Sequence, residues 1–412
     1  MTDARLSRYI VNHDHANHAE DIADKEMMIK LKEGVLKDPT KGTKRVYNEV
    51  AKDEMRNSND VSETVAKIPT YKRVARTMQR QKSKLLPPEP TSLELINLTG
   101  DWLETNNKEQ FLAINDGTTD RIVVYATKEF AIRMAKADIL FCDGTFKSVP
   151  KLFKQLYTFH AKYDKQMIPL VYCLLPSKSA ATYMRLLNLL RDWISSFGFT
   201  LSPKEIMVDY EQAMITTIRR VFPNTRVRGC LFHYTQCIYR HVQSCGLSVE
   251  YLHSIGNDES NNVEADFKKV VRRFLALPFL PLTELEDAHT EIMEDIDLND
   301  QRVSAFSDYH LDNWFKDGST YPRELWNQYR NFCDRTNNGV EGWHSAFNKA
   351  VGKSHPRLYQ FIDIIKDQQL EFELVSRQVD NGESTVTLRR KYITLNDRIK
   401  NLTAILDWIC RC

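Results

Sequence analysis

The sequence predicts a mixed α/β core followed by an almost wholly helical region. Five short segments with strand-like apolar patterns occur between residues 139 and 230, and amphipathic helices separate the last three. Beyond Cys230 nearly every apolar pattern is helical. Consecutive strands can pair as antiparallel neighbours, whereas strands joined through helices return parallel. We therefore expect a mixed five-stranded sheet with flanking helices on both faces.

The strands of this sheet follow from their apolar patterns. Residues 154–163 alternate, as in a strand with one covered face, whereas residues 168–175 are almost all apolar, as in a strand buried on both faces. The other predicted strands span residues 139–142, 205–208 and 226–230. Before them, two short apolar runs flank Asn115-Asp116-Gly117, which is a hairpin signal.

The bulk composition limits the class of protein. The net charge is +2, from 57 Lys and Arg against 55 Asp and Glu, so any nucleic-acid surface must come from local segregation of charge. The eight cysteines are scattered and no secretory signal precedes them, which predicts free thiols in a reducing compartment. The longest apolar run, residues 167–176, is shorter than the roughly 20 residues that cross a bilayer. We expect a soluble intracellular protein.

A basic helical region is predicted over residues 21–90. No acidic residue occurs from Thr64 to Pro88, and Arg73, Arg76 and Arg80 share one helical face. This face, together with neighbouring cations, suits a phosphate backbone. The alternatives are a solvated basic helix, a nuclear targeting cluster, or helices that cap the main domain. The predicted DNA-binding residues are Lys72, Arg73, Arg76, Arg80, Lys82 and Lys84.

Two aspartates end neighbouring strands of the predicted sheet. Asp143 follows the first strand and Asp209 the fourth, so both fall at one edge. Two adjacent carboxylates repel each other, and a hard divalent cation such as Mg²⁺ or Mn²⁺ relieves that repulsion. Glu341 lies in the first turn of a later helix and could point back at them. The alternative is two ordinary strand-end aspartates.

Other candidate ligands and contacts are weaker. Cys230 and His233 could begin a zinc site, or could form a packed strand-to-helix junction. His13 and His15 could contribute to a zinc site, or could belong to a polar tail. Trp343 could stack on an unpaired DNA base, or could be a core residue.

Four motifs in order resemble the transposase domain of Mutator-like elements (MULE). They are Phe141–Phe146, Val208–Ala213, Gly229–Gln236 and Asn337–His344. The resemblance covers about residues 111–351. It implies a ribonuclease-H-like fold, an Asp-Asp-Glu metal triad of Asp143, Asp209 and Glu341, and a helical insertion before the glutamate helix.

The resemblance also implies a domain organisation. His13-Asp14-His15 resembles the end of a FLYWCH-type zinc finger, but the two cysteines of that finger are absent, so either the finger is lost or the sequence starts inside it. The implied parts are a finger remnant or polar tail (1–20), the basic helical region (21–90), the transposase core (91–236), the helical insertion (237–335), two helices completing the core (336–380) and a helical tail (381–412).

The activity implied by the resemblance is DNA transposition. Two Mg²⁺ or Mn²⁺ ions would support cleavage at transposon ends and joining to target DNA. The partners would be double-stranded terminal inverted repeats and target DNA, with a homodimer or larger synaptic complex, in the nucleus and without a membrane. One alternative is a domesticated, catalytically silent DNA-binding or regulatory protein, and another is an RNA nuclease of the same fold.

Overall fold

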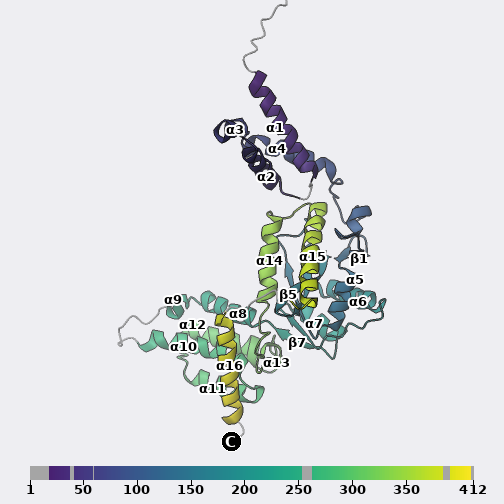
Figure 1. The fold of residues 1–412 in the computed structure, drawn as a ribbon. Helices are drawn as coiled ribbons and strands as arrows, with labels where there is room; N and C mark the ends of the chain where they lie inside the picture. The colour runs from purple at the N-terminus through teal and green to yellow at the C-terminus, as the bar shows by residue number, and fades with distance from the viewer. Residues whose placement is uncertain (1–17, 38–40, 59, 253–261, 384–389, 410–412) are drawn as a thin grey trace, which may run out of the picture. The chain divides into compact units, whose positions relative to one another are not determined.

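A computed structural model describes the chain except for residues 1–17, 38–40, 59, 253–261, 384–389 and 410–412 (Figure 1). It divides into two compact units. One, the N-terminal unit, comprises residues 1–89 with 358–364, and the other, the sheet unit, comprises residues 90–357 with 365–412. The proposed zinc-finger remnant at His13 and His15 lies outside the described residues.

The described residues of the first 89 form four helices, in keeping with the predicted helical region. They are α1 (His18–Lys37), α2 (Thr43–Arg56), α3 (Val61–Lys67) and α4 (Tyr71–Leu85). The apolar faces of α1, α2 and α4 meet in one small core, in which Leu31 of α1, Val46 of α2 and Met78 of α4 are buried. Asp60 caps α3 by accepting a hydrogen bond from the backbone N–H of Glu63, at 3.1 Å.

The sheet has seven strands, so the prediction of five was wrong. The strands are β1 (Leu112–Asp116), β2 (Ile122–Tyr125), β3 (Ile139–Thr145), β4 (Gln155–Tyr163), β5 (Gln166–Leu175), β6 (Glu205–Val208) and β7 (Arg226–Gly229). Their order is β1-β2-β5-β4-β3-β6-β7. The two additional strands are the predicted hairpin, which joins the sheet because the buried strand β2 pairs antiparallel with β5.

The strand directions agree with the predicted mixed sheet. β3, β4 and β5 are antiparallel neighbours, whereas β6 runs parallel to β3, and β7 runs parallel to β6. The helices α6 (Ala180–Ser195) and α7 (Gln212–Val221) connect the parallel strands. Chain connectivity through helices therefore produced the parallel half of the sheet, as the sequence order predicts.

Helices cover both faces of this sheet (Figure 1). On one face, Tyr183 of α6 packs against Tyr157 of β4, with 5.4 Å between ring centroids. On the other, Val340 of α14 (Asn338–Val351) is buried against Phe141 of β3. Phe141 pairs with His160 of β4, so these two side chains lie on the same face of the sheet. Tyr157 is three residues from His160 along β4, and because side chains alternate along a strand it lies on the opposite face.

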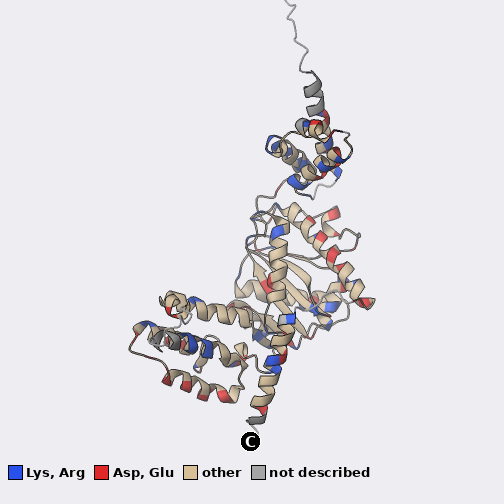
Figure 2. Ribbon diagram, turned by 60° about the vertical axis from the view of Figure 1, so that its left-hand side comes forward, with Lys and Arg blue, Asp and Glu red and all other residues tan. Residues whose placement is uncertain are grey.

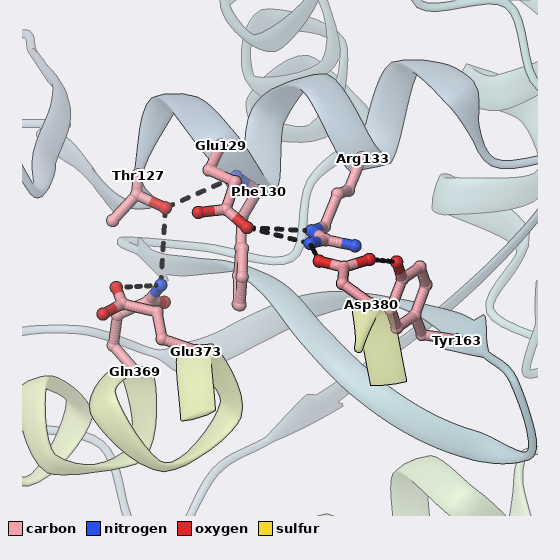
Figure 3. A network of polar contacts seen from close by, with 8 residues as sticks. All are labelled: Thr127, Glu129, Phe130, Arg133, Tyr163, Gln369, Glu373 and Asp380. Carbon is pink, nitrogen blue, oxygen red and sulfur yellow. Dashed lines mark hydrogen bonds and ion pairs between the residues drawn. The ribbon is translucent and has the colours of Figure 1, made fainter. Parts of the chain in front are cut away.

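Polar contacts fasten α5 (Lys128–Lys136) to α15 (Leu358–Asp380), as Figure 3 shows. Gln369 of α15 donates to the hydroxyl of Thr127, which also caps α5. At the other end of α5, Arg133 pairs with Asp380 at 2.7 Å. The hydroxyl of Tyr163, at the end of β4, donates to the same carboxylate. These contacts hold the end of α15 against α5 and β4.

The described residues between β7 and α14 are mainly helical, although residues 316–337 contain only one short helix. They include α8 (Leu231–Ser244), α9 (Ser248–Leu252), α10 (Asn262–Ala276), α11 (Leu285–Glu294), α12 (Gln301–His310) and α13 (Arg323–Trp326). The rings of Tyr234, Trp314 and Trp326 form their buried centre. A last helix, α16 (Arg390–Ile409), contacts this region through Asp407 and Tyr329. No helix in the described ranges is long and apolar enough to span a membrane.

Candidate metal centre

Asp143 and Asp209 lie at the same edge of the sheet. β3 and β6 are parallel, and their register places Phe141 beside Met207. Each aspartate is two residues further along its own chain, so the two carboxylates emerge beside each other. β6 ends at Val208, just before Asp209, whereas β3 continues past Asp143 to Thr145 as the partner of β4, so the prediction that Asp143 follows the end of its strand was wrong.

The carboxylate of Asp143 is held on both oxygens. Its Oδ1 accepts a hydrogen bond from the N–H of Gly144 at 2.7 Å. Its Oδ2 lies 3.4 Å from Nδ1 of His344, which comes from α14. A carboxylate oxygen can accept more than one contact, so these partners orient Asp143 and leave lone pairs for a cation.

Asp209 has a raised pKa. Burial, followed by the negative charges of Asp143 and Glu211, raises it to about 6. A hydrogen bond from the N–H of Glu211 to Asp209 Oδ1, at 3.2 Å, and the nearby His233 act in the opposite direction. The repulsion between the carboxylates is that expected of a site that holds positive charge between them.

Glu341 is brought to the site by the N-terminus of α14. Asn337, which precedes the helix, donates its side-chain N–H to the carbonyl of Cys142 and its backbone N–H to Sγ of Cys230, both at 3.2 Å. These two bonds dock the helix on β3 and on the end of β7. Glu341, in the first turn, then lies with Oε1 3.5 Å from Nε2 of His233.

The electrostatic environment of Glu341 links it to the two aspartates. Burial raises its pKa, His233 lowers it, and the charge of Asp143 raises it again. Its Oε1 is buried and accepts no hydrogen bond from the described residues. Asp143 therefore influences both other acids.

The three acids share a neighbourhood but do not form a closed set of ligands. Among the described residues, no group of three or more His, Cys, Asp or Glu side chains is placed to hold a metal ion. The donor chemistry nevertheless fits Mg²⁺ or Mn²⁺. The oxygens are hard ligands, two of the acids have raised pKa values, and no described residue donates a hydrogen bond to Glu341 Oε1.

The geometry at Cys230 and His233 favours a packed junction over zinc. Cys230 is buried, accepts the hydrogen bond from Asn337, and has a pKa raised by burial to about 11. His233 faces Glu341, whereas His241 stacks on Tyr309 with 3.7 Å between ring centroids. Cys230 and His233 thus support the glutamate helix from the start of α8.

The predicted DNA contacts differ in exposure. Lys72, Arg73, Arg76, Arg80 and Lys84 are exposed on α4, and Figure 2 shows basic residues in this N-terminal unit.

Two of the predicted DNA contacts are buried. Lys82 is buried, and its ammonium group donates to the carbonyl of Lys41 at 2.7 Å, so it is not part of the exposed face. Trp343 is also buried, donates to Gln368 at 3.1 Å and stacks on Phe347, which places it in the core.

Sequence reasoning missed three residues beside the carboxylates. Glu211 lies two residues after Asp209 and accepts a hydrogen bond from Tyr183 at 3.0 Å, and its spacing could have marked it as a further acid. Phe146 and Phe232 are large apolar side chains that remain 43% and 39% exposed. Lys178 lies 3.9 Å from the ring centroid of Phe146. Exposure of a phenylalanine depends on tertiary packing, so no local pattern announces it.

One cavity of the sheet unit lies away from the three acids. It has a volume of about 730 Å³ and lies around the opposite end of β3, and its lining includes Ile139, Arg133, Lys162 and Asp334. None of the three acids lines it.

One protein family has a sequence model that matches this part of the chain. The family model described as MULE transposase domain matches residues 139–237, from β3 into α8. The match includes Asp143, Asp209, Cys230 and His233 and ends before Glu341. No curated protein sequence matches the chain. The segment that carries both aspartates is therefore similar to a MULE transposase domain.

Proposed function

We propose that this protein is a DNA transposase of the Mutator-like type, acting through Asp143, Asp209 and Glu341. One observation carries the proposal: two electrostatically coupled aspartates emerge at one sheet edge, within the segment that matches a transposase domain. Transposases cut and join phosphodiester bonds, and acidic side chains that hold divalent ions suit that chemistry.

The strand order supports a ribonuclease-H-like core. Within the seven strands, β5-β4-β3-β6-β7 comprises an antiparallel three-stranded meander followed by two parallel strands. In this interpretation β1 and β2 extend the sheet at the edge away from the acids. The helices between β7 and α14 are the insertion that separates the two aspartates from the glutamate.

Asp143, Asp209 and Glu341 would hold two Mg²⁺ or Mn²⁺ ions. When bound, such ions lower the pKa of a water or of a DNA 3′-hydroxyl and stabilise the leaving oxygen. The protein's own residues orient the acids: Asn337 docks the glutamate helix, and His233 faces Glu341.

The exposed cations of α4 would contact the DNA backbone without reading its sequence. The partners in this proposal are terminal inverted repeats and target DNA, brought together by a dimer or larger complex in the nucleus.

The test uses the purified full-length protein with DNA that carries the inverted repeats flanking its coding sequence. Asp143→Asn, Asp209→Asn and Glu341→Gln should each abolish Mg²⁺-dependent nicking and joining while DNA binding is preserved. Asp138→Asn is the matched control, because this exposed acid pairs only with Lys204 among the described residues, at 3.0 Å. Strand transfer that persists in Asp209→Asn would overturn the proposal.

A second candidate function is a catalytically silent, DNA-binding relic. It is favoured by the lack of a ready-made three-ligand group among the described residues. The same assay separates the two functions, because a relic binds the inverted repeat but neither nicks nor joins it when Mg²⁺ or Mn²⁺ is added.

A further inference from the structure

A buried chain of polar groups leads from the centre of the sheet to Asp143. Nε2 of His160 lies 2.9 Å from Oγ1 of Thr158, which lies 3.2 Å from Nε2 of His344. Nδ1 of His344 then lies 3.4 Å from Oδ2 of Asp143. The first three side chains are buried. Buried polar side chains are rarely aligned in this way without a structural or catalytic role.

The chemistry of these groups determines which of them donates each hydrogen bond. The carboxylate of Asp143 can only accept, so the His344 nitrogen that faces it carries a proton. A neutral imidazole then has an acceptor at Nε2, which can receive the hydroxyl proton of Thr158. Thr158 in turn can accept from His160 Nε2–H. The hydroxyl has one competing acceptor, the backbone carbonyl of Asp143, but at the longer distance of 3.4 Å.

Ring packing fixes the two imidazoles. His160 meets the edge of Trp343 at 5.1 Å between ring centroids and that of His344 at 6.3 Å. Burial keeps the pKa of His160 well below its ordinary value, so this ring is neutral and can donate through only one nitrogen. Packing therefore fixes both imidazole rings in this row of polar side chains.

The placement of His344 on α14 couples two of the acids. His344 follows Glu341 by three residues, and positions three apart share one side of a helix. The same docking of α14 therefore presents Glu341 and brings an N–H group to Asp143. A movement of the helix would displace one acid and release the other.

We propose that His344 is a positioning residue, held as its Nδ1–H tautomer by Thr158 and His160, that orients Asp143 for a divalent ion. This inference rests on the proposed function for its purpose, but the 3.4 Å contact between His344 Nδ1 and Asp143 Oδ2 does not. Residues that hydrogen-bond to metal ligands commonly change metal affinity about 10- to 100-fold when they are replaced.

Two substitutions test the roles of the two ring nitrogens of His344 separately. In His344→Asn, the amide N–H can occupy the place of Nδ1–H and still donate to Asp143. In His344→Gln, the amide reaches the place of Nε2 and meets Thr158 instead. The two variants have similar polarity, so a purely structural role predicts no ordered difference between them in metal binding.

The first measurement is nuclear magnetic resonance of the full-length, metal-free protein with ¹⁵N-labelled histidine. The His344 signals, assigned by their loss in His344→Asn, should show a protonated Nδ1 and an unprotonated Nε2. Thr158→Val should alter them by removing the hydroxyl. A His344 found as the Nε2–H tautomer would overturn the inference, whatever the protein's activity.

The second measurement is Mn²⁺ affinity by titration calorimetry, with thermal unfolding as the control for folding. We expect His344→Gln to weaken Mn²⁺ binding about 10-fold or more, and His344→Asn to restore most of that loss. Equal affinities of the two variants would overturn the positioning role. Wild-type protein that shows the Nδ1–H tautomer but no Mn²⁺ binding would instead overturn the metal centre and the proposed function.

Discussion

Replacement of Gly229 by alanine tests how tightly the aspartate edge is packed. Gly229 is the last residue of β7, and a Cβ atom there would lie 2.5 Å from three atoms of the Tyr210 ring. Ordinary carbon–carbon contacts are about 3.5–4.0 Å, so the overlap is about 1 Å or more. The ring has little room to retreat, because it packs against Trp314 at 4.8 Å and Tyr321 at 5.0 Å.

Overpacking of this kind costs about 1–3 kcal/mol, and a wedged ring places Gly229→Ala in the upper half of that range. The free energy of unfolding can be measured in urea by tryptophan fluorescence. All six tryptophans are at residue 102 or beyond, so the signal reports the sheet unit. The midpoint should fall while the slope with urea stays unchanged.

Gly342→Ala is the matched control. A Cβ atom at Gly342, in α14, would meet nothing within 4 Å, so the higher helix propensity of alanine should stabilise the protein by about 0.5–1 kcal/mol. When the ring is absent in Tyr210→Ala, adding Gly229→Ala should lower the free energy of unfolding only slightly further. A Gly229→Ala protein as stable as wild type would refute the reasoning, as would an undiminished cost when Tyr210 is alanine.

Three further predictions concern buried polar side chains, with one exposed arginine as a contrast. Lys82→Ala should destabilise the N-terminal unit by about 1–3 kcal/mol, measured by thermal unfolding, without weakening DNA binding. Arg80→Ala should instead reduce the salt dependence of DNA affinity by about one ion, measured by anisotropy titrations at several salt concentrations. Glu205→Gln should cost about 3–5 kcal/mol in urea unfolding because it leaves Arg228 unpaired, whereas Glu205→Leu/Arg228→Met should be nearly neutral. Burial lowers the pKa of His289 to about 4 in the folded protein, whereas an unfolded histidine has a pKa near 6.5. The unfolded chain therefore takes up a proton first, and stability should fall as the pH drops from about 6.5 towards 4. His289→Gln should make this fall smaller in a pH series of thermal unfolding.

The strands and their directions could be predicted because they depend on local pattern and on chain connectivity. Residues 168–175 are apolar on both faces, and helices between the later strands force them to run parallel. The size of the sheet could not be predicted in the same way. β2 pairs with β5, about 50 residues away in the chain, and nothing in the hairpin itself specifies that partner.

Lys82 shows why a charge pattern alone misplaces a side chain. Val74 and Met78 are buried, and Lys82 continues the same row at four-residue spacing. Its position on the apolar stripe of α4 was visible in the sequence, but its charge suggested the opposite face. The structure places the carbonyl of Lys41 beside it, and this acceptor lets the ammonium group be buried with a hydrogen bond.

The proposed metal centre depends on a connection that no single motif contains. Asp143 and Asp209 are fixed by the register of β3 and β6, which is local to the sheet. Glu341 reaches them only because Asn337 joins α14 to the backbone of Cys142 and the thiol of Cys230. The motifs around Asp143, Cys230 and Glu341 are thus parts of one docking surface, and the order of motifs along the chain reports their contact in space. The helical region between these motifs also bears on the acids, because its Trp314 and Tyr321 pack against the ring of Tyr210, which follows Asp209 directly.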